Sequence, residues 1–115
     1  MARLDLERMP PVLAALLTPW DRAIGTAGPG MGGHVVAVAD NTLSALGHRV
    51  VPTPRLERAF RDARAATEAL AAALDGATIL PFWRRDAARE SLGELAVWLR
   101  RAEPNAVTKD LGLGW

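Results

Sequence analysis

Cysteine and tyrosine are absent from these 115 residues, and histidine occurs only twice. Without cysteine the chain has no disulfide, no thiol nucleophile and none of the common zinc ribbons. Neither sign of charge is in excess, because 14 basic residues face 13 acidic ones and leave a formal net charge of +1. That balance does not supply the phosphate contacts that hold most nucleic-acid binders, so we do not expect a nucleic-acid partner.

Long apolar runs are also missing. Uninterrupted apolar runs such as Val12–Leu17 fall far short of the roughly 20 residues that a membrane span requires. The first eight residues mix charges of both signs, and no apolar run follows, so we predict neither a signal peptide nor a transit peptide. We therefore expect a cytoplasmic protein that does not contact a membrane. Thirteen arginines against the single Lys109 are typical of a GC-rich genome, and we expect a bacterial one.

Alanine is the abundant residue, with 22 copies, and half of all residues are apolar. This composition indicates a globular chain whose core is built from small and aliphatic side chains, which let helices approach closely. The length suits a single domain over residues 1–115, large enough to bury a core. The periodicities described below predict an all-α protein, a small bundle of four to five helices.

The clearest helical pattern lies in Arg55–Leu74. At about 100° per residue its apolar side chains share one narrow arc, and its charged side chains occupy the other half of the cylinder. The predicted packing stripe consists of Leu56, Phe60, Ala63, Thr67, Leu70 and Leu74. Arg58/Asp62, Glu57/Arg61 and Arg64/Glu68 have the spacing of solvent-exposed i,i+4 ion pairs.

A second long helix is predicted to end before Pro104. Its apolar arc contains Ala87, Ala88, Ser91, Leu92, Leu95, Trp98, Leu99 and Ala102, and Gly93 falls on the polar side. Only a short connection around Asp75–Thr78 separates the two helices, and short connections join antiparallel neighbours. The pair is therefore expected to form a C-terminal antiparallel hairpin of about 54–75 and 80–103.

Prolines divide the N-terminal segment. Pro10-Pro11 is a helix start, and Pro19 is expected to end this first helix near Leu17 because it cannot continue a hydrogen-bonded turn. Thr18 would then cap a new helix that ends at Gly25.

The segment His34–Gly47 is ambiguous in sequence. Its apolar side chains share one helical arc, which favours a helix that ends at Gly47. The β-branched content of Val35–Ala39 leaves a short strand as the alternative.

Glycine is concentrated in Gly25–Gly33, where it occupies five of nine positions. We interpret this stretch as a loop or hinge. The alternative is a phosphate cradle beside His34, but no strand precedes the loop, no Gly-Lys-Ser/Thr follows it, and Pro29 lacks a backbone N–H.

No set of residues predicts catalysis, a metal site or a cofactor site. The histidines, His34 and His48, have no thiol to join them, and the nearest acid, Asp40, would face a different side of the helix from His34. His48, next to Gly47, suits a helix-terminal cation.

Contact surfaces are the better candidates. Trp83, Arg84 and Trp115 are the predicted partner contacts, because tryptophan and arginine are enriched at interface anchors. Arg85, Arg89 and Arg100, on one edge of the last helix, are the predicted anion contacts. Trp98 belongs to the predicted core. Residues 105–115 form a short tail, too glycine-rich to be an independent element.

The segment Arg84–Trp115 combines a leucine-rich helix, the stop Arg-Arg-Ala-Glu-Pro and a downstream tryptophan. In these features it resembles the C-terminal helical segment of the ImpA-type accessory proteins of type VI secretion. The likeness covers less than a third of the chain, nothing N-terminal to it matches, and it assigns no residue a role.

Together these observations predict a non-catalytic assembly subunit or adaptor that packs against copies of itself or against a larger protein. Two alternatives remain. The first is a small ligand-binding or enzymatic domain that uses Gly25–Gly33 and His34. The second is a weakly basic DNA-associated regulator that places its arginines on phosphates.

Overall fold

The computed structural model describes residues 4–76, 82–106 and 108, and of Phe82 only the backbone. It is all-helical, as predicted. In chain order the elements are the short 3-10 helix η1 (Leu6–Arg8) and the α-helices α1 (Pro11–Thr26), α2 (Gly32–Gly47), α3 (Pro54–Gly76) and α4 (Phe82–Arg101). Across these ranges the only β-type pairing is an isolated bridge between Val50 and Pro104. No helix of the described part has the length and apolarity to cross a membrane.

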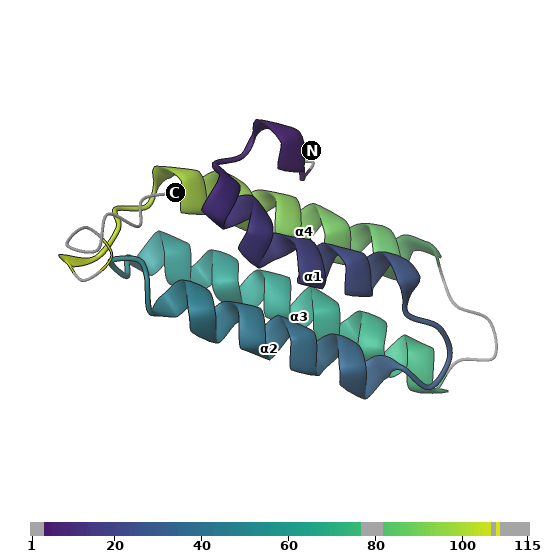
Figure 1. Cartoon of the computed structure of the whole chain (residues 1–115). Helices are drawn as coiled ribbons and strands as arrows, with labels where there is room; N and C mark the ends of the chain where they lie inside the picture. The colour runs from purple at the N-terminus through teal and green to yellow at the C-terminus, as the bar shows by residue number, and fades with distance from the viewer. Residues whose placement is uncertain (1–3, 77–81, 107, 109–115) are drawn as a thin grey trace.

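The four α-helices lie lengthwise beside one another and enclose one core (Figure 1). α1 packs against α2 and α4, and α3 packs against the same two helices, so each helix has two neighbours. The molecule measures 49 × 26 × 25 Å along its principal axes. One end of the bundle carries the α1–α2 loop and the start of α4, and the other end carries the α2–α3 connection and the end of α4 (Figure 1).

The contact between α3 and α4 is the most extensive of the helix pairs. α4 begins at the end of the bundle where α3 finishes (Figure 1). The connection that would make the two a hairpin, residues 77–81, lies outside the described residues. The packing of the two helices is therefore established, and the hairpin itself stays a prediction.

The predicted break at Pro19 is wrong. α1 runs without interruption from Pro11 to Thr26 with Pro19 inside it. Pro19 is exposed, so its ring displaces no core contact, and the carbonyl of exposed Ala15, which loses its i+4 donor, faces solvent. The Thr18 hydroxyl does not cap a new helix but donates to the Ala14 carbonyl over 2.7 Å. The buried side of α1 is uninterrupted and holds the helix together through the proline.

The ambiguous segment is a helix, because α2 spans Gly32–Gly47. The predicted glycine loop is accordingly shorter than expected, since Gly32 and Gly33 are the first residues of α2. α2 can lie close to α3 because Gly32 has no side chain. A Cβ there would stand 2.4 Å from Asp75 Oδ2 and 2.5 Å from the Ala71 carbonyl oxygen.

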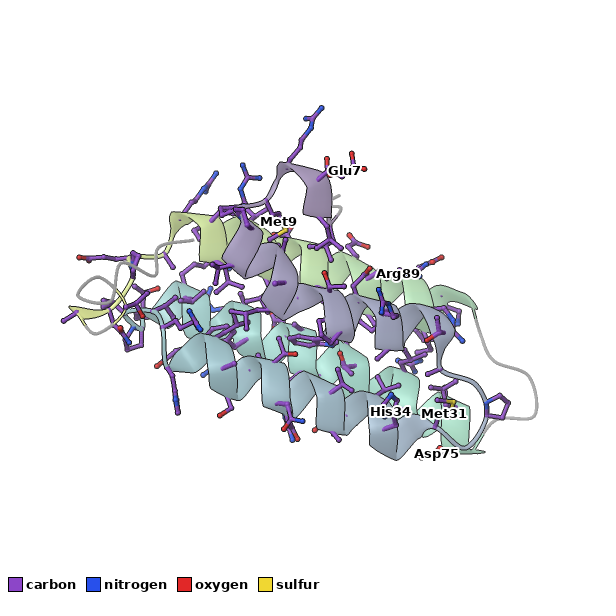
Figure 2. All side chains as sticks on the ribbon, in the orientation of Figure 1. Glu7, Met9, Met31, His34, Asp75 and Arg89 are labelled. Atoms are coloured by element: carbon purple, nitrogen blue, oxygen red, sulfur yellow. The ribbon has the colours of Figure 1, made fainter. Side chains whose placement is uncertain are left out.

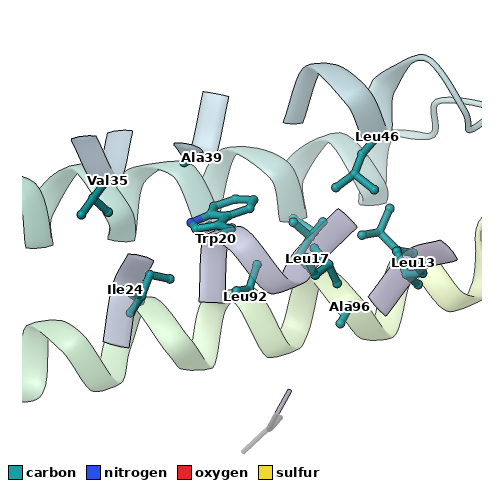
Figure 3. Close-up of a cluster of buried hydrophobic side chains, with 14 of the residues drawn as sticks. Leu13, Leu17, Trp20, Ile24, Val35, Ala39, Leu46, Leu92 and Ala96 are labelled. Carbon is teal, nitrogen blue, oxygen red and sulfur yellow. The ribbon is translucent and has the colours of Figure 1, made fainter. Parts of the chain in front are cut away.

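Trp20 occupies the middle of the core and is fully buried (Figure 3). Its indole Nε1 donates to Thr67 Oγ1 over 3.1 Å, and that hydroxyl in turn donates to the Ala63 carbonyl over 2.8 Å. The polar Thr67 in the apolar stripe of α3 is thereby explained, because it satisfies a buried indole that would otherwise lack an acceptor.

The predicted stripe of α3 is confirmed in its buried members, with Phe60 only partly buried. In α4 the buried face is rotated away from the predicted arc, because α4 packs on α1 as well as on α3. Four members of that arc are only partly buried: Ala87, Ser91, Trp98 and Ala102. Ala96 is buried, and Gly93 is buried rather than on the polar side. Figure 3 shows Leu92 and Ala96 near side chains of α1.

The segment after α4 is hydrogen-bonded to the connection between α2 and α3. The Asn105 backbone N–H donates to the Arg49 carbonyl over 2.8 Å, and its side-chain amide donates to the His48 carbonyl over 2.6 Å. The Val51 N–H donates to the Glu103 carbonyl over 2.8 Å. These bonds join the α2–α3 connection to the end of α4.

Candidate functional site

Side chains suited to acid–base catalysis or metal binding do not come together at one site in the described part of the chain. Within residues 4–76, 82–106 and 108, no three side chains of the metal-binding types come together. His34 and His48 are both exposed and lie at opposite ends of α2, on the order of 20 Å apart at 1.5 Å per residue. Figure 2 shows His34 with Met31 and Asp75 at the end where α2 begins.

Backbone N–H groups of the glycine loop donate hydrogen bonds to other groups of the protein. Gly30 N–H donates to the Leu74 carbonyl over 3.1 Å, Gly28 N–H to Met31 Sδ over 3.3 Å, and Gly32 N–H to Asp75 Oδ1 over 2.9 Å. The Asp75 carboxylate thus stands at the N-terminus of α2, where a phosphate cradle would hold its anion. A lid function would have to break these contacts between the loop and α3.

The three predicted anion contacts do not form one surface. Arg85 donates to the carbonyls of Ile24 and Ala27, the latter over 3.0 Å, and so binds the C-terminal end of α1. Arg89 lies against the same end of α1, because a Cβ on Gly25 would stand 2.3 Å from its Nη2 (Figure 2). Arg100 is exposed about three turns beyond Arg89 along α4, on the order of 20 Å from Arg85.

The predicted partner contacts Trp83 and Arg84 form one pair, in which Trp83 is exposed and Arg84 is half-buried. The Arg84 guanidinium lies 3.9 Å from the centroid of the Trp83 ring, within the range of a cation–π contact. Trp83 is 58% exposed, the highest exposure of any large hydrophobic side chain in the described ranges. Trp115, the third predicted contact, lies outside the described residues.

Trp98 has surroundings that the sequence analysis missed. It is half-buried between α3 and α4, and two guanidinium groups flank its ring, Arg55 at 4.5 Å and Arg101 at 5.3 Å from the centroid. The spacing of Arg101 from Trp98 is visible in the sequence as i,i+3. The approach of Arg55 is a contact between two helices and has no local sequence signal.

Two cavities adjoin Trp98. The larger, of about 260 Å³, is lined by Trp98, Arg55 and Arg101 together with the apolar Val51, Leu56 and Ala102, and also by Thr53 and Glu103. We call it the Trp98 pocket. The smaller, of about 170 Å³, shares Arg55 and Trp98 and has Asp62 and Glu94 in its lining. The larger cavity therefore has two guanidinium groups and one carboxylate in its lining, and the smaller has one guanidinium and two carboxylates.

Charge pairs elsewhere join helices or support them locally. Arg64 of α3 donates to Asp40 of α2 over 2.8 Å and also pairs with Glu68. The Arg64 guanidinium lowers the pKa of Asp40 through this hydrogen bond. Of the three predicted i,i+4 pairs, Arg64/Glu68 forms, whereas Glu57/Arg61 and Arg58/Asp62 are not among the ion pairs of the described residues.

No protein-family model, curated protein or solved structure matches this chain. The resemblance of Arg84–Trp115 to type VI secretion accessory proteins accordingly has no support beyond the residues that suggested it.

Proposed function

We propose that this protein is a non-catalytic cytoplasmic assembly subunit that binds other proteins, a second copy of itself first among them, through the end of the bundle that carries Trp83 and Arg84. The observation that carries the proposal is the exposed Trp83, which pairs with the half-buried Arg84. A tryptophan that is 58% exposed leaves apolar surface in water, and contact with a partner would remove that surface.

Both residue types favour this interpretation. Tryptophan and arginine are the side chains most enriched at the energetic centres of protein interfaces. Arg84 holds the indole in one orientation through the 3.9 Å contact, which lowers the entropy that binding would cost. Met31, 41% exposed, lies at the same end of the bundle and adds a flexible apolar side chain (Figure 2).

The overall charge favours a second copy as the partner. A formal net charge of +1 produces little repulsion between two copies of the chain. We infer that α3 and α4 act as the predicted antiparallel hairpin, a rigid scaffold that holds the Trp83 end in place. The alternative partner is a larger protein complex, which would bind the same end of the bundle.

The test is the mass in solution by light scattering over a concentration series. We expect the mass to rise above that of one chain with increasing concentration, and we expect Trp83→Ser to weaken this association at least tenfold, as replacement of an interface anchor does.

Val51→Ser is the matched control, because Val51 is also an exposed apolar residue, at 38%, but lies at the other end of the bundle. Val51→Ser should associate as the native chain does. A native chain that stays a single copy at every concentration, or a Val51→Ser variant weakened as much as Trp83→Ser, would contradict association through the Trp83 end.

A further inference from the structure

The end of the bundle opposite Trp83 carries the Trp98 pocket, which the proposed function does not use. Its walls come from the α2–α3 connection, the first turn of α3 and the last turn of α4. The bonds of Asn105 and Glu103 to the α2–α3 connection hold these walls together. The cavity thus lies between elements that are joined to one another by hydrogen bonds.

Its lining combines two kinds of surface. Val51, Leu56, Ala102 and the Trp98 ring supply apolar walls. Arg55 and Arg101 supply two guanidinium groups, one from each helix. At about 260 Å³ the cavity is at the small end of ligand sites, and it suits a small molecule or a single side chain.

Both arginines contact the Trp98 ring. In the described part of the chain the arginines that form ion pairs are Arg8 and Arg64, not Arg55 or Arg101. A guanidinium that stacks on a ring keeps the N–H donors at its edge available, and their planar fork matches a carboxylate. Two such groups at one apolar cavity favour an anion that carries an apolar body.

We infer that the Trp98 pocket binds a carboxylate attached to a small apolar group, with the apolar group against Val51 and Leu56 and the carboxylate between Arg55 and Arg101. Glu103 in the lining disfavours a doubly charged phosphate, which leaves a monoanion as the better match. The carboxylate has two sources, a free small acid or the last residue of a protein chain.

The experiment follows the indole Nε1–H signal of Trp98 by NMR, assigned with Trp98→Phe, during titration with N-acetyl-leucine. We expect this signal to shift in a saturable way, with little change in the Trp20 signal, whose indole is fully buried and bonded to Thr67. N-acetyl-leucinamide has the same apolar body without the charge and should bind at least tenfold more weakly.

Arg55→Gln and Arg101→Gln should each weaken N-acetyl-leucine about tenfold. Arg100→Gln is the matched control, because it removes the same charge from the neighbouring position without lining the pocket, and it should bind as the native chain does. Circular dichroism of each variant verifies that the helices are retained.

4-Methylpentanoate distinguishes the two sources. It keeps the carboxylate and the branched apolar group but lacks the peptide group, so equal binding indicates a free acid, and binding of N-acetyl-leucine alone indicates a chain end. The inference is overturned if the Trp98 signal does not move at millimolar N-acetyl-leucine, if the amide binds as well as the acid, if Arg100→Gln weakens binding as much as Arg55→Gln, or if inorganic phosphate competes.

Discussion

Gly32 shows how the absence of one side chain sets the distance between two helices. Its N–H donates to Asp75 Oδ1 over 2.9 Å, and its Cα faces the Ala71 carbonyl of α3. A methyl group here has no room, because the nearest carboxylate and carbonyl oxygens would stand 2.4 and 2.5 Å away. The first turn of α2 can therefore pack on α3 only with glycine at this position.

Gly32→Ala is expected to destabilise the protein by about 1–3 kcal/mol, because α2 must move away from Asp75 to admit the methyl group. Urea unfolding measures the change. Gly33→Ala is the control, since a Cβ on Gly33 meets nothing within 4 Å, and it should raise stability by up to about 1 kcal/mol through helix propensity. Equal stability of the two variants would show that α2 and α3 are not this close.

Asp40 links stability to acid pH. Its hydrogen bond from Arg64 lowers its pKa in the folded protein, so the carboxylate stabilises the fold above its ordinary pKa of about 3.9. That contribution is lost as the pH falls through the lowered pKa. Asp40→Asn should therefore be less stable than the native chain at pH 7, and the difference should fade below about pH 4.

Thermal unfolding at several pH values measures this difference. Asp62→Asn is the control, because Asp62 is exposed on α3 and is not among the ion-paired residues of the described ranges. A difference between Asp40→Asn and the native chain that grows as the pH falls would contradict the ion pair with Arg64.

Among the helices, α1 shows that tertiary packing can outweigh a local signal. Pro19 satisfies every sequence rule for a helix end, yet α1 continues through it to Thr26. The buried residues on either side, Leu17 and Trp20, face one continuous core. The cost of the proline falls on the exposed side of the helix, because Pro19 and Ala15, whose carbonyl loses its donor, are both exposed.

Pro19→Ala is accordingly expected to stabilise the protein by about 1–2 kcal/mol, because the new N–H can bond the Ala15 carbonyl while the unfolded chain gains some freedom. Pro11→Ala is the matched control. Pro11 is at the first helical position, where proline is favourable, so its replacement should be neutral or slightly destabilising. A loss of stability in Pro19→Ala would indicate that α1 is two helices.

Helix α3 was predicted best, and it has a clear cap. Its predicted apolar arc matches most of the buried face, although Ala59 and Ala71 are buried as well, and Thr53 caps the predicted start by accepting from the Leu56 N–H over 3.1 Å. In α4 the predicted arc was displaced, because Gly93 and Ala96 are buried in a helix that packs on α1 as well as on α3. The periodicity of a single helix does not show how many other helices will pack against it.

The candidate contact surfaces also differ in how far they could be predicted from local sequence. Trp83 and Arg84 were both predicted as partner contacts, and Trp83 is exposed, but their contact with each other was not predicted. The Trp98 pocket could not be predicted, because Arg55 reaches the ring from another helix and Val51 from the connection before it. Arg85 and Arg89 were candidates for an external anion, and their contacts with the end of α1 depend on the packing of α1 against α4.

The whole molecule is a bundle with different chemistry at its two ends. At one end stands an exposed indole under a guanidinium, and at the other a half-buried indole between two guanidiniums beside a cavity. The core between them is apolar apart from the hydrogen-bonded pair Trp20 and Thr67 and the buried Thr42 of α2. We propose that the middle of the bundle provides stability and that its ends contact other molecules.

A dilution series that follows the indole Nε1–H signal of Trp83 by NMR, assigned with Trp83→Phe, tests contact through that end most directly. The signal should shift or broaden as the concentration rises, in step with the mass, while the signal of the buried Trp20 stays in place. A Trp83 signal that is the same at every concentration while the chain self-associates would contradict the proposal, because association would then take place elsewhere on the bundle.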